Sequence, residues 1–444
     1  RWRYVLLIQG VFLVGFFLAA WIRSRIPAIV FTPLWWGAEK WSDYTLLSSL
    51  TRQTEFPPLD PWLAGFPVNY YYFGHLAWAT LTKLTGIAPN VTYNLAVATI
   101  PPLAAVLCIS LGYHLFRSAG AGLLLALLVV IGGNLKPILQ LRENFGSLEE
   151  LKAYGQPATA ISFWDGSRAM EWNGSAVVRL PEIHEMPSFS FILGDLHPHF
   201  SSHPLFLGLL LVLAGLWRAG QRRTFSGHEL LRSRWPLWVA LSLLAGLLYA
   251  TNSWDCFVGL FLAAVVLPFA RGMRVWSPSA RIVFAGLVLV VTWIVATQIF
   301  VIPYYIYFTP PKLLSAEFLE AWPFVAIDGP LKIVPVSLRS TFGQWFYYFG
   351  LFFTPYLLWQ IWGAIERTPD TPIDKRTAVL AVAVAAGFVA TVEGQNRLMG
   401  LLAFLLVALA PEAFRPRRRW GLEFAGILTW WGLLISFLCE IFYY

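Results

Sequence analysis

Residues 56–75 read FPPLDPWLAGFPVNYYYFGH, and this stretch decides how the chain is expected to meet a membrane. Its four prolines have no backbone N–H, and Gly74 can adopt a positive φ, so a fixed, irregular segment is predicted here and not a membrane span. Three consecutive tyrosines, Tyr70–Tyr72, stand between Asn69 and His75. A polar, aromatic loop in so apolar a chain indicates the first half of an active site.

The composition around this stretch is that of a membrane protein. Of the 444 residues 57% are hydrophobic and only 13% are charged, which soluble globular proteins do not show. Long continuous apolar runs favour helices over barrel strands. The net charge of +8 does not indicate nucleic acid, because the arginines cluster in short loops between the runs. The three cysteines lie in apolar runs without metal-ligand spacing and are predicted to be small core residues.

The apolar runs predict an all-α, polytopic bundle of about 11 spans, from roughly 17–25 residues per crossing. The predicted spans are 4–22, 93–116, 118–133, 199–217, 235–251, 254–270, 282–303, 345–364, 377–392, 398–411 and 420–440. We expect one membrane domain, 1–444. The chain starts at Arg1 without a methionine and stops just after an apolar run, so we expect it to be truncated at both ends.

The segment 70–86 is the ambiguous one, and the arginine distribution decides it. If 70–86 lies along the membrane surface and the N-terminus is cytoplasmic, 18 of the 32 Lys and Arg face the cytoplasm. If it crossed, every later arginine-rich loop would face outward, against the positive-inside bias. We therefore predict a multi-pass plasma-membrane protein with a juxtamembrane helix at 70–86. Its long extracytoplasmic loops would be 23–92, 134–198 and 304–344.

This topology brings the unusual polar clusters to the extracytoplasmic side, as a single site requires. The densest cluster is EIHEMPSFSFILGDLHPHFSSHP, residues 182–204, which holds four of the seven histidines. Pro198 breaks the helix between His197 and His199, so both side chains can face one point. With Asp195 they are candidate ligands for a divalent metal, Mg or Mn. Alternatively, these residues only cap the following span at the headgroup boundary.

Two carboxylates upstream of the tyrosines are candidate catalytic groups. Glu39 and Asp43 are four residues apart, so a helix places them on one face. One of them could serve as general base toward an acceptor hydroxyl. They could equally be solvated loop acids beside Lys40. The tyrosine rings could stack on a sugar. Alternatively, the tyrosines form an aromatic belt at the membrane interface.

The remaining candidates lie at span ends. Asn252 and Asp255 start a span, where an N-cap explains one of them. Arg397 is a candidate ligand for a phosphate group. Alternatively, it forms an ion pair with Glu393, four residues earlier in the chain. The candidate substrate-binding residues are Asp60, Asn69, Tyr70, Tyr71, Tyr72, His75, Glu182, Glu185, Asn252, Asp255 and Arg397.

Four blocks carry a family resemblance: EKWSD (39–43), the stretch 56–75, EMPSFSFILGDLHPH (185–199) and ATNSWD (250–255). They resemble the signature blocks of the YYY family, uncharacterised integral membrane proteins of archaea and Chloroflexi-type bacteria. That family is distantly similar to the GT-C membrane glycosyltransferases. The resemblance implies a GT-C-like fold, a polyprenyl-phosphate sugar donor, Glu39 or Asp43 as the acid of the first extracytoplasmic loop, and 70–86 as a juxtamembrane helix.

The sequence therefore predicts an inverting GT-C-like glycosyltransferase that acts on the extracytoplasmic face with a carboxylate general base. Its expected partners are membrane lipid and a polyprenyl-phosphate sugar donor, and no nucleic acid. The alternative is a transporter or lipid-binding permease in which the His/Asp cluster couples protons or ions. Such a protein is expected to carry ionisable residues near the middle of its spans. A non-catalytic scaffold is a third reading.

Overall fold

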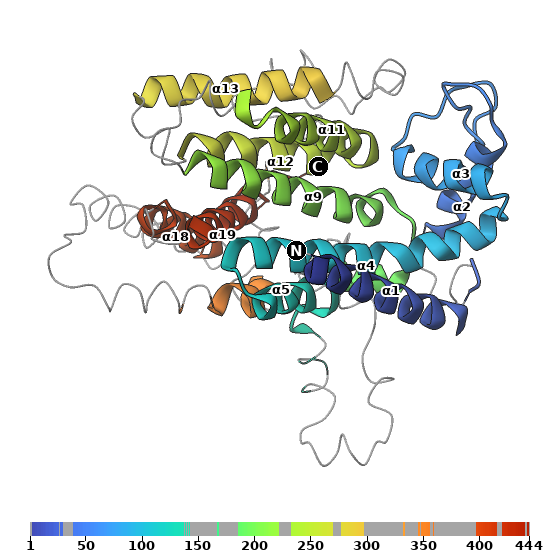
Figure 1. Ribbon diagram of the computed structural model, residues 1–444, viewed down its shortest axis with the longest axis horizontal. Coiled ribbons are helices and arrows are strands. Elements are labelled where there is room, and N and C mark those ends of the chain that lie inside the picture. The colour runs from blue at the N-terminus through green and yellow to red at the C-terminus, as the bar shows by residue number, and fades with distance from the viewer. Residues whose placement is uncertain are drawn as a thin grey trace, which may run out of the picture. The chain divides into compact units, whose positions relative to one another are not determined.

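Figure 1 shows the computed structural model of the protein. The structure describes residues 2–25, 27–29, 39–136, 185–221, 232–269, 277–296, 397–414 and 420–439. It also describes a few shorter pieces between residues 138 and 358 and residues 442–443. The chain forms two compact units. The first comprises 1–132, 190–309 and 416–424, and the second comprises 133–189, 310–415 and 425–444. Each unit is described by itself below.

The first unit is built of helices. These are α1 (Trp2–Arg25), α2 (Lys40–Arg52), α3 (Phe73–Thr85), α4 (Pro89–Phe116), α5 (Ala119–Ala126) with a π-helical end η1 (Leu127–Ile131), α9 (Pro198–Gly220), α11 (Trp235–Thr251), α12 (Ser253–Val266) with a 3₁₀ end η4 (Leu267–Phe269), and α13 (Pro278–Ile294). The helix α8 (Pro187–Leu193) precedes α9. In Figure 1, α1, α4, α9, α11 and α12 form the long body of the unit, with α2 and α3 at one end.

Small residues let the long helices approach closely. A Cβ on Gly112 of α4 would lie 2.6 Å from the Cα of Gly122 in α5, so the two backbones touch there. A Cβ on Gly15 of α1 would lie 2.8 Å from the Cβ of Pro102. Such small-residue contacts are the usual way in which membrane helices pack. The interior of the unit is filled by large side chains such as Trp217 and Phe200, both nearly fully buried.

Hydropathy supports the membrane class of the chain. Four described helices are long and apolar enough to cross a bilayer: Tyr4–Arg25, Pro89–Phe116, Pro198–Gly220 and Trp420–Cys439. Shorter apolar helices cover Ala119–Ile131, Trp235–Thr251, Ser253–Val266, Ser279–Ile294 and Leu398–Ala410. These helices coincide with nine of the predicted spans. The total of about 11 spans stays a prediction, and the predicted span 377–392 lies outside the described residues.

The stretch 56–75 is irregular up to Tyr72, as its prolines predict, and α3 follows. At 13 residues α3 is too short to cross a bilayer. Its position along the membrane surface stays a prediction. The reason given for Gly74 was wrong, because Gly74 lies within α3 and has no positive φ. It is needed for close packing, since a Cβ there would lie 2.9 Å from the Cβ of Ser201 in α9. The positive φ of the stretch is found at Gly65.

The second unit contains α18 (Arg397–Ala413) and most of α19 (Trp420–Cys439), together with a two-residue antiparallel pair of β1 (Lys332–Ile333) and β2 (Phe442–Tyr443). Its core is a cluster of Trp345, Leu398, Leu402, Leu405, Leu406 and Leu433. The indole N–H of Trp430 donates to the backbone oxygen of Leu406 at 2.8 Å. Most of the predicted loops 134–198 and 304–344 lies outside the described residues, so the predicted single domain and its loops stay predictions.

Candidate functional site

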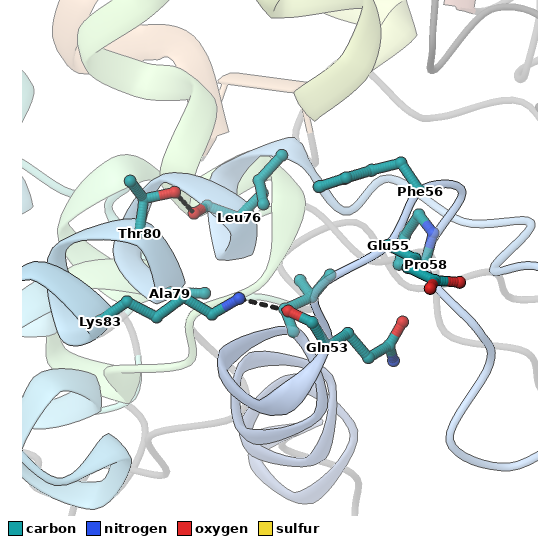
Figure 2. Close-up of a pocket in the computed structure, with 9 residues that line it drawn as sticks. Gln53, Glu55, Phe56, Pro58, Leu76, Ala79, Thr80 and Lys83 are labelled. Carbon is teal, nitrogen blue, oxygen red and sulfur yellow. Dashed lines mark hydrogen bonds between the residues drawn. The ribbon is translucent and has the colours of Figure 1, made fainter.

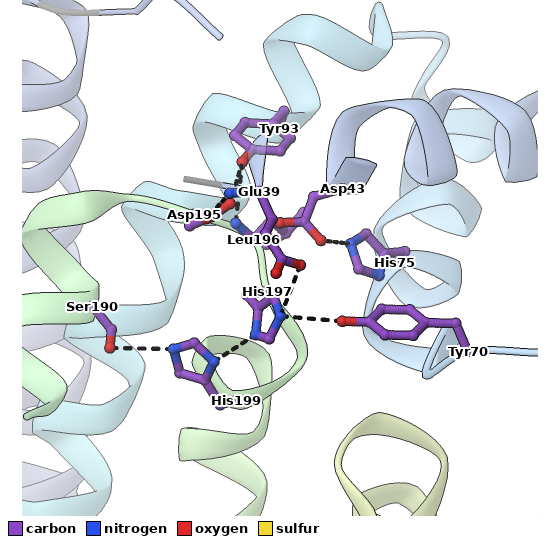
Figure 3. A network of polar contacts seen from close by, with 10 residues as sticks. All are labelled: Glu39, Asp43, Tyr70, His75, Tyr93, Ser190, Asp195, Leu196, His197 and His199. Atoms are coloured by element: carbon purple, nitrogen blue, oxygen red, sulfur yellow. Dashed lines mark hydrogen bonds and ion pairs between the residues drawn. The ribbon is translucent and has the colours of Figure 1, made fainter. Parts of the chain in front are cut away.

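The polar residues meet at the end of the first unit where α2, α3 and the turn before α9 come together (Figure 3). The turn, residues 194–197, depends on Gly194, which has φ +63. A Cβ there would also lie 3.2 Å from Val97 in α4. Glycine therefore allows the turn to lie close to α4 and to present Asp195 and His197. Pro198 then begins α9 at its first position, as predicted from its missing N–H.

Two buried carboxyl groups form the centre of the site. Asp43 is 2% exposed and Asp195 is 5% exposed, and their side chains share a hydrogen bond. Such a bond between two carboxyl groups requires a proton. Asp43 Oδ2 is buried and meets no N–H or O–H group among the described residues. Burial is the main cause that raises the pKa of Asp43 to about 7 and that of Asp195 to about 8.

The two carboxyl groups therefore titrate together near neutrality. Burial raises the pKa of both carboxyl groups, and the contact with Asp43 raises that of Asp195 further. A pair of this kind carries about one proton between its two macroscopic titrations. One carboxylate at the centre thus remains ionised and available to accept a proton.

Three groups hold this pair in place. The backbone N–H of Glu39 donates to Asp195 Oδ2 at 2.6 Å. The Tyr93 hydroxyl donates to Asp195 Oδ1 at 3.5 Å and accepts from the N–H of Leu196 at 3.1 Å. His75 Nε2 lies 3.0 Å from Asp43 Oδ1. Burial lowers the pKa of His75 to about 3, so its contact with Asp43 is a hydrogen bond of a neutral imidazole and not an ion pair.

Two cations lie close to Asp195. Arg23 near the end of α1 and Lys40 at the start of α2 both interact electrostatically with Asp195, and they repel each other. Arg23 Nε is held by Asn94 Oδ1 at 2.6 Å. Burial is the main cause that lowers the pKa of Lys40, which is only 5% exposed. Arg23 and Lys40 are therefore candidate groups to bind an anion near Asp195.

A chain of histidines runs along one side of the pair. His197 Nδ1 and His199 Nδ1 lie 2.5 Å apart, so these two rings do turn toward one another, as the proline between them predicts. His197 Nε2 lies 3.1 Å from Glu39 Oε2 and 3.1 Å from the Tyr70 hydroxyl. His199 Nε2 lies 3.3 Å from Ser190 Oγ. The exposed fractions of Glu39 (54%) and His197 (25%) place them at the open edge of the site.

The divalent metal expected at Asp195, His197 and His199 does not fit this geometry. Among the described residues no group of three His, Cys, Asp or Glu side chains is arranged to hold a metal ion. The two imidazole Nδ1 atoms face each other directly, and Asp195 is directed to Asp43, Glu39 and Tyr93. The metal stays an untested prediction, and no chemistry is routed through one.

The three tyrosines have different surroundings. Tyr70 is 38% exposed and its hydroxyl contacts His197. Tyr71 is half-buried, and its hydroxyl lies 2.7 Å from Ser253 Oγ at the start of α12. Tyr72 is 4% exposed, and burial raises its pKa to about 12. Tyr70 therefore faces the site, whereas Tyr71 and Tyr72 fix the segment against the helices.

A second polar cluster surrounds Asp255 in the first turn of α12. Ser202 Oγ donates to Asp255 Oδ2 at 2.5 Å, and Asn252 Nδ2 donates to the same atom at 3.1 Å. Asn252 occupies the N-cap position, but its side chain accepts no capping hydrogen bond and instead donates to Asp255. This cluster joins α9 to α12.

The other predicted substrate-binding residues are not brought to the carboxyl pair by any described contact. Asp60 Oδ1 accepts from the N–H groups of Trp62 and Leu63, which explains it as a turn residue. Glu185 belongs to the second unit, and Arg397 begins α18 there. Glu182 lies outside the described residues. Substrate contacts of these residues, and of the exposed Asn69, stay predictions.

Sequence reasoning missed Tyr93, Arg23 and Ser202. Tyr93 and Arg23 lie within or beside apolar runs that predict spans, where hydropathy hides a single polar group. A signal was present, because an ionisable residue at a span end is a functional candidate.

The comparisons with known proteins give one match. A family model described as "Uncharacterized membrane protein (DUF2298)" matches residues 1–444. No curated protein and no solved structure matches the chain.

Proposed function

The chain belongs to this family of uncharacterised membrane proteins, and we propose that it is a GT-C-like enzyme that transfers a sugar from a polyprenyl-phosphate donor to an acceptor hydroxyl at the Asp43–Asp195 pair. The observation that carries the proposal is the buried carboxyl pair with a pKa near neutrality. General bases work best when their pKa lies close to the operating pH.

Asp43 is the general base in this proposal, and Glu39 is not. Asp43 is buried, receives a hydrogen bond from neutral His75, and shares the proton of Asp195. Glu39 is more than half exposed and pairs with His197. Glu39 therefore orients His197 at the entrance, while Asp43 takes the proton of the acceptor hydroxyl.

The step is a single displacement. The acceptor oxygen gives its proton to the Asp43 carboxylate and forms a bond to the anomeric carbon. The bond between that carbon and the phosphate oxygen breaks, and the electron pair leaves with the polyprenyl phosphate. One displacement inverts the anomeric configuration.

The donor phosphate is assigned to the two cations beside Asp195. Arg23 and Lys40 interact with Asp195 and repel each other, and a phosphate between them would relieve that repulsion. Arg397, the phosphate ligand predicted from the sequence, lies in the second unit and stays a separate prediction. The open edge at Glu39, Tyr70 and His197 admits the acceptor.

The test is a transfer assay with the full-length protein in liposomes. Donors are a polyprenyl-phosphate sugar, a polyprenyl-diphosphate sugar and a nucleotide sugar. We expect transfer from a lipid-linked donor and none from the nucleotide sugar, and loss of transfer in Asp43→Asn but not in the matched exposed variant Glu55→Gln. Transfer that survives Asp43→Asn overturns the general-base role. Transfer that uses only the nucleotide sugar overturns the donor class.

One observation favours a second candidate, a proton-coupled transporter. The contacts Ser190–His199–His197–Glu39 form a row of groups that can pass protons, beside a pair that titrates near neutrality. A pH gradient across proteoliposomes would then drive uptake of a substrate, and Asp43→Asn would abolish the coupling without any transfer reaction being present.

A further inference from the structure

The loop between α2 and α3 carries an unusual apolar surface. Five large apolar side chains in 56–66 are more than half exposed: Phe56 (54%), Leu59 (53%), Trp62 (70%), Leu63 (57%) and Phe66 (58%). No charged residue occurs between 61 and 69. Soluble surfaces rarely expose a contiguous apolar patch of this kind, so it needs a partner. These residues, 56–66, are called the apolar tip.

The tip has a defined backbone. Asp60 Oδ1 accepts from the N–H groups of Trp62 at 2.7 Å and Leu63 at 3.0 Å. The N–H of Phe66 donates to Leu63 at 3.2 Å, and the N–H of Asp60 donates to Phe66 at 2.8 Å. Gly65 adopts the left-handed φ of +86 that the turn requires. The hydrogen bonds that close this turn therefore hold the apolar side chains outward.

The base of the tip is attached to both neighbouring helices. The side chain of Gln53 exchanges two hydrogen bonds with the backbone of Leu59, at 2.6 and 2.8 Å. Lys83 of α3 donates to the backbone oxygen of Gln53. Figure 2 shows the small cavity of about 90 Å³ that this joint encloses, with Phe56, Pro58 and Lys83 on its wall. The tip therefore moves with α2 and α3.

The short connection from α3 to α4 places the tip near one end of a candidate membrane span. α3 ends at Thr85, and α4, which is long and apolar enough to cross a bilayer, begins at Pro89. The intervening chain can span at most about 14 Å, from ~3.3–3.6 Å per residue. The exposed cation Arg52 ends α2 and the exposed Lys83 lies in the last turn of α3, so two groups that suit lipid phosphates stand beside the tip. The one acid of the tip, Asp60, accepts from N–H groups of its own turn.

We propose that the apolar tip inserts into the headgroup–acyl boundary of the bilayer that the chain itself spans, at the end where α4 begins. Trp62, the most exposed of the five side chains, is of a type enriched at this depth. The hydrogen bonds of the turn already engage the N–H groups of Asp60, Trp62, Leu63 and Phe66, which lowers the cost of placing them in lipid. The tip thereby holds α2 and α3, and with them Asp43 and His75, at the membrane surface. This inference does not depend on the proposed reaction.

The test places nitroxide labels along the loop. Cys439 is the exposed cysteine and the other two are buried, so Cys439→Ser gives a background for Trp62→Cys, Leu63→Cys and the control Thr54→Cys. The full chain is reconstituted in liposomes of phosphatidylcholine and phosphatidylglycerol. Collisions are measured with oxygen, which concentrates in the acyl region, and with a water-soluble nickel chelate.

We expect the nickel accessibility of labels at 62 and 63 to be several-fold lower than at Thr54, with oxygen accessibility higher. In a folded Trp62→Asp variant, the label at 63 should regain nickel accessibility. Equal nickel accessibility at the tip and at Thr54 overturns the proposal. Low accessibility that persists in Trp62→Asp, or spin–spin broadening between two tips, assigns the surface to a protein contact or a second copy and also overturns it.

Discussion

Asp255 and the Asp43–Asp195 pair are carboxylates of the same unit, but the donors around them differ. Asp255 receives a hydroxyl and an amide, from Ser202 at 2.5 Å and Asn252 at 3.1 Å. Asp43 and Asp195 face each other and need a proton between them. A carboxylate that accepts from a hydroxyl and an amide and faces no second carboxyl group joins helices, whereas two buried carboxyl groups that face each other keep a proton between them. The first arrangement stabilises structure and the second is suited to chemistry.

The largest expected effect comes from removing the base. Asp43→Asn should lower sugar transfer by roughly 10²–10⁴-fold, the usual contribution of general-base catalysis, because the amide cannot accept a proton. The thermal midpoint should stay close to that of the parent, since the asparagine amide can donate to Asp195. The initial rate of transfer is measured against Glu55→Gln as the matched control. Equal rates in the two variants would assign Asp43 to structure, as for Asp255.

Asp255→Ala should act on stability instead. Ser202 and Asn252 would lose their shared acceptor, at a cost of about 1–3 kcal/mol for buried groups left without partners. The midpoint of denaturant unfolding in micelles is the measurement, with Ser202→Ala as a companion variant that should cost less because it removes only one donor. If Asp255→Ala leaves stability unchanged but abolishes transfer, the structural role assigned to Asp255 is wrong.

The next largest effect is expected in the pH dependence of stability, which reports on the Asp43–Asp195 pair. A carboxyl group whose pKa rises from 3.8 to about 8 on folding stabilises the folded state fully below 3.8, and this contribution is lost as the pH rises through about 8. His75 acts oppositely, because its pKa falls from 6.5 to about 3, but its contribution is complete above 6.5. Between these limits the contribution of Asp195 still changes with pH, whereas that of His75 no longer does.

We therefore expect the thermal midpoint of the parent to fall from about pH 6.5 to about pH 8, and to fall less in Asp195→Asn, which carries one titrating carboxyl group fewer. Glu55→Gln, at an exposed carboxyl group, serves as the control. The coupling of Asp43 to Asp195 is refuted if Asp195→Asn shows the full slope of the parent.

The smallest effects are expected from single tyrosine hydroxyls. Tyr70→Phe removes the contact with His197 at the open edge and should raise the KM for the acceptor by up to about tenfold, since one hydrogen bond contributes about 0.5–1.5 kcal/mol. Tyr71→Phe removes the contact with Ser253 and should instead cost about 1 kcal/mol of stability. A reversed pattern would place Tyr71, and not Tyr70, at the site.

The sequence predicted the helical elements well because hydropathy and proline act locally. The apolar runs coincide with helices, and the break at Pro198 turns His197 and His199 toward each other. The pairing of Asp43 with Asp195 was not predicted, because residues 152 positions apart meet only through the packing of α2 on the turn before α9. The metal predicted at Asp195, His197 and His199 came from their proximity in sequence and stays a prediction.

The most direct test of the account is the protonation of the pair itself. Infrared difference spectra of the reconstituted protein, recorded between about pH 6 and about pH 9, report the carbonyl stretch of protonated carboxyl groups. We predict a band of a protonated carboxyl group that persists at neutral pH, is lost toward pH 9, and is strongly reduced in the double variant Asp43→Asn/Asp195→Asn but retained in Asp255→Asn. The reduction is not complete because burial also raises the pKa of Asp255. A parent spectrum without any protonated carboxyl group at neutral pH would contradict the shared proton on which the proposed reaction rests.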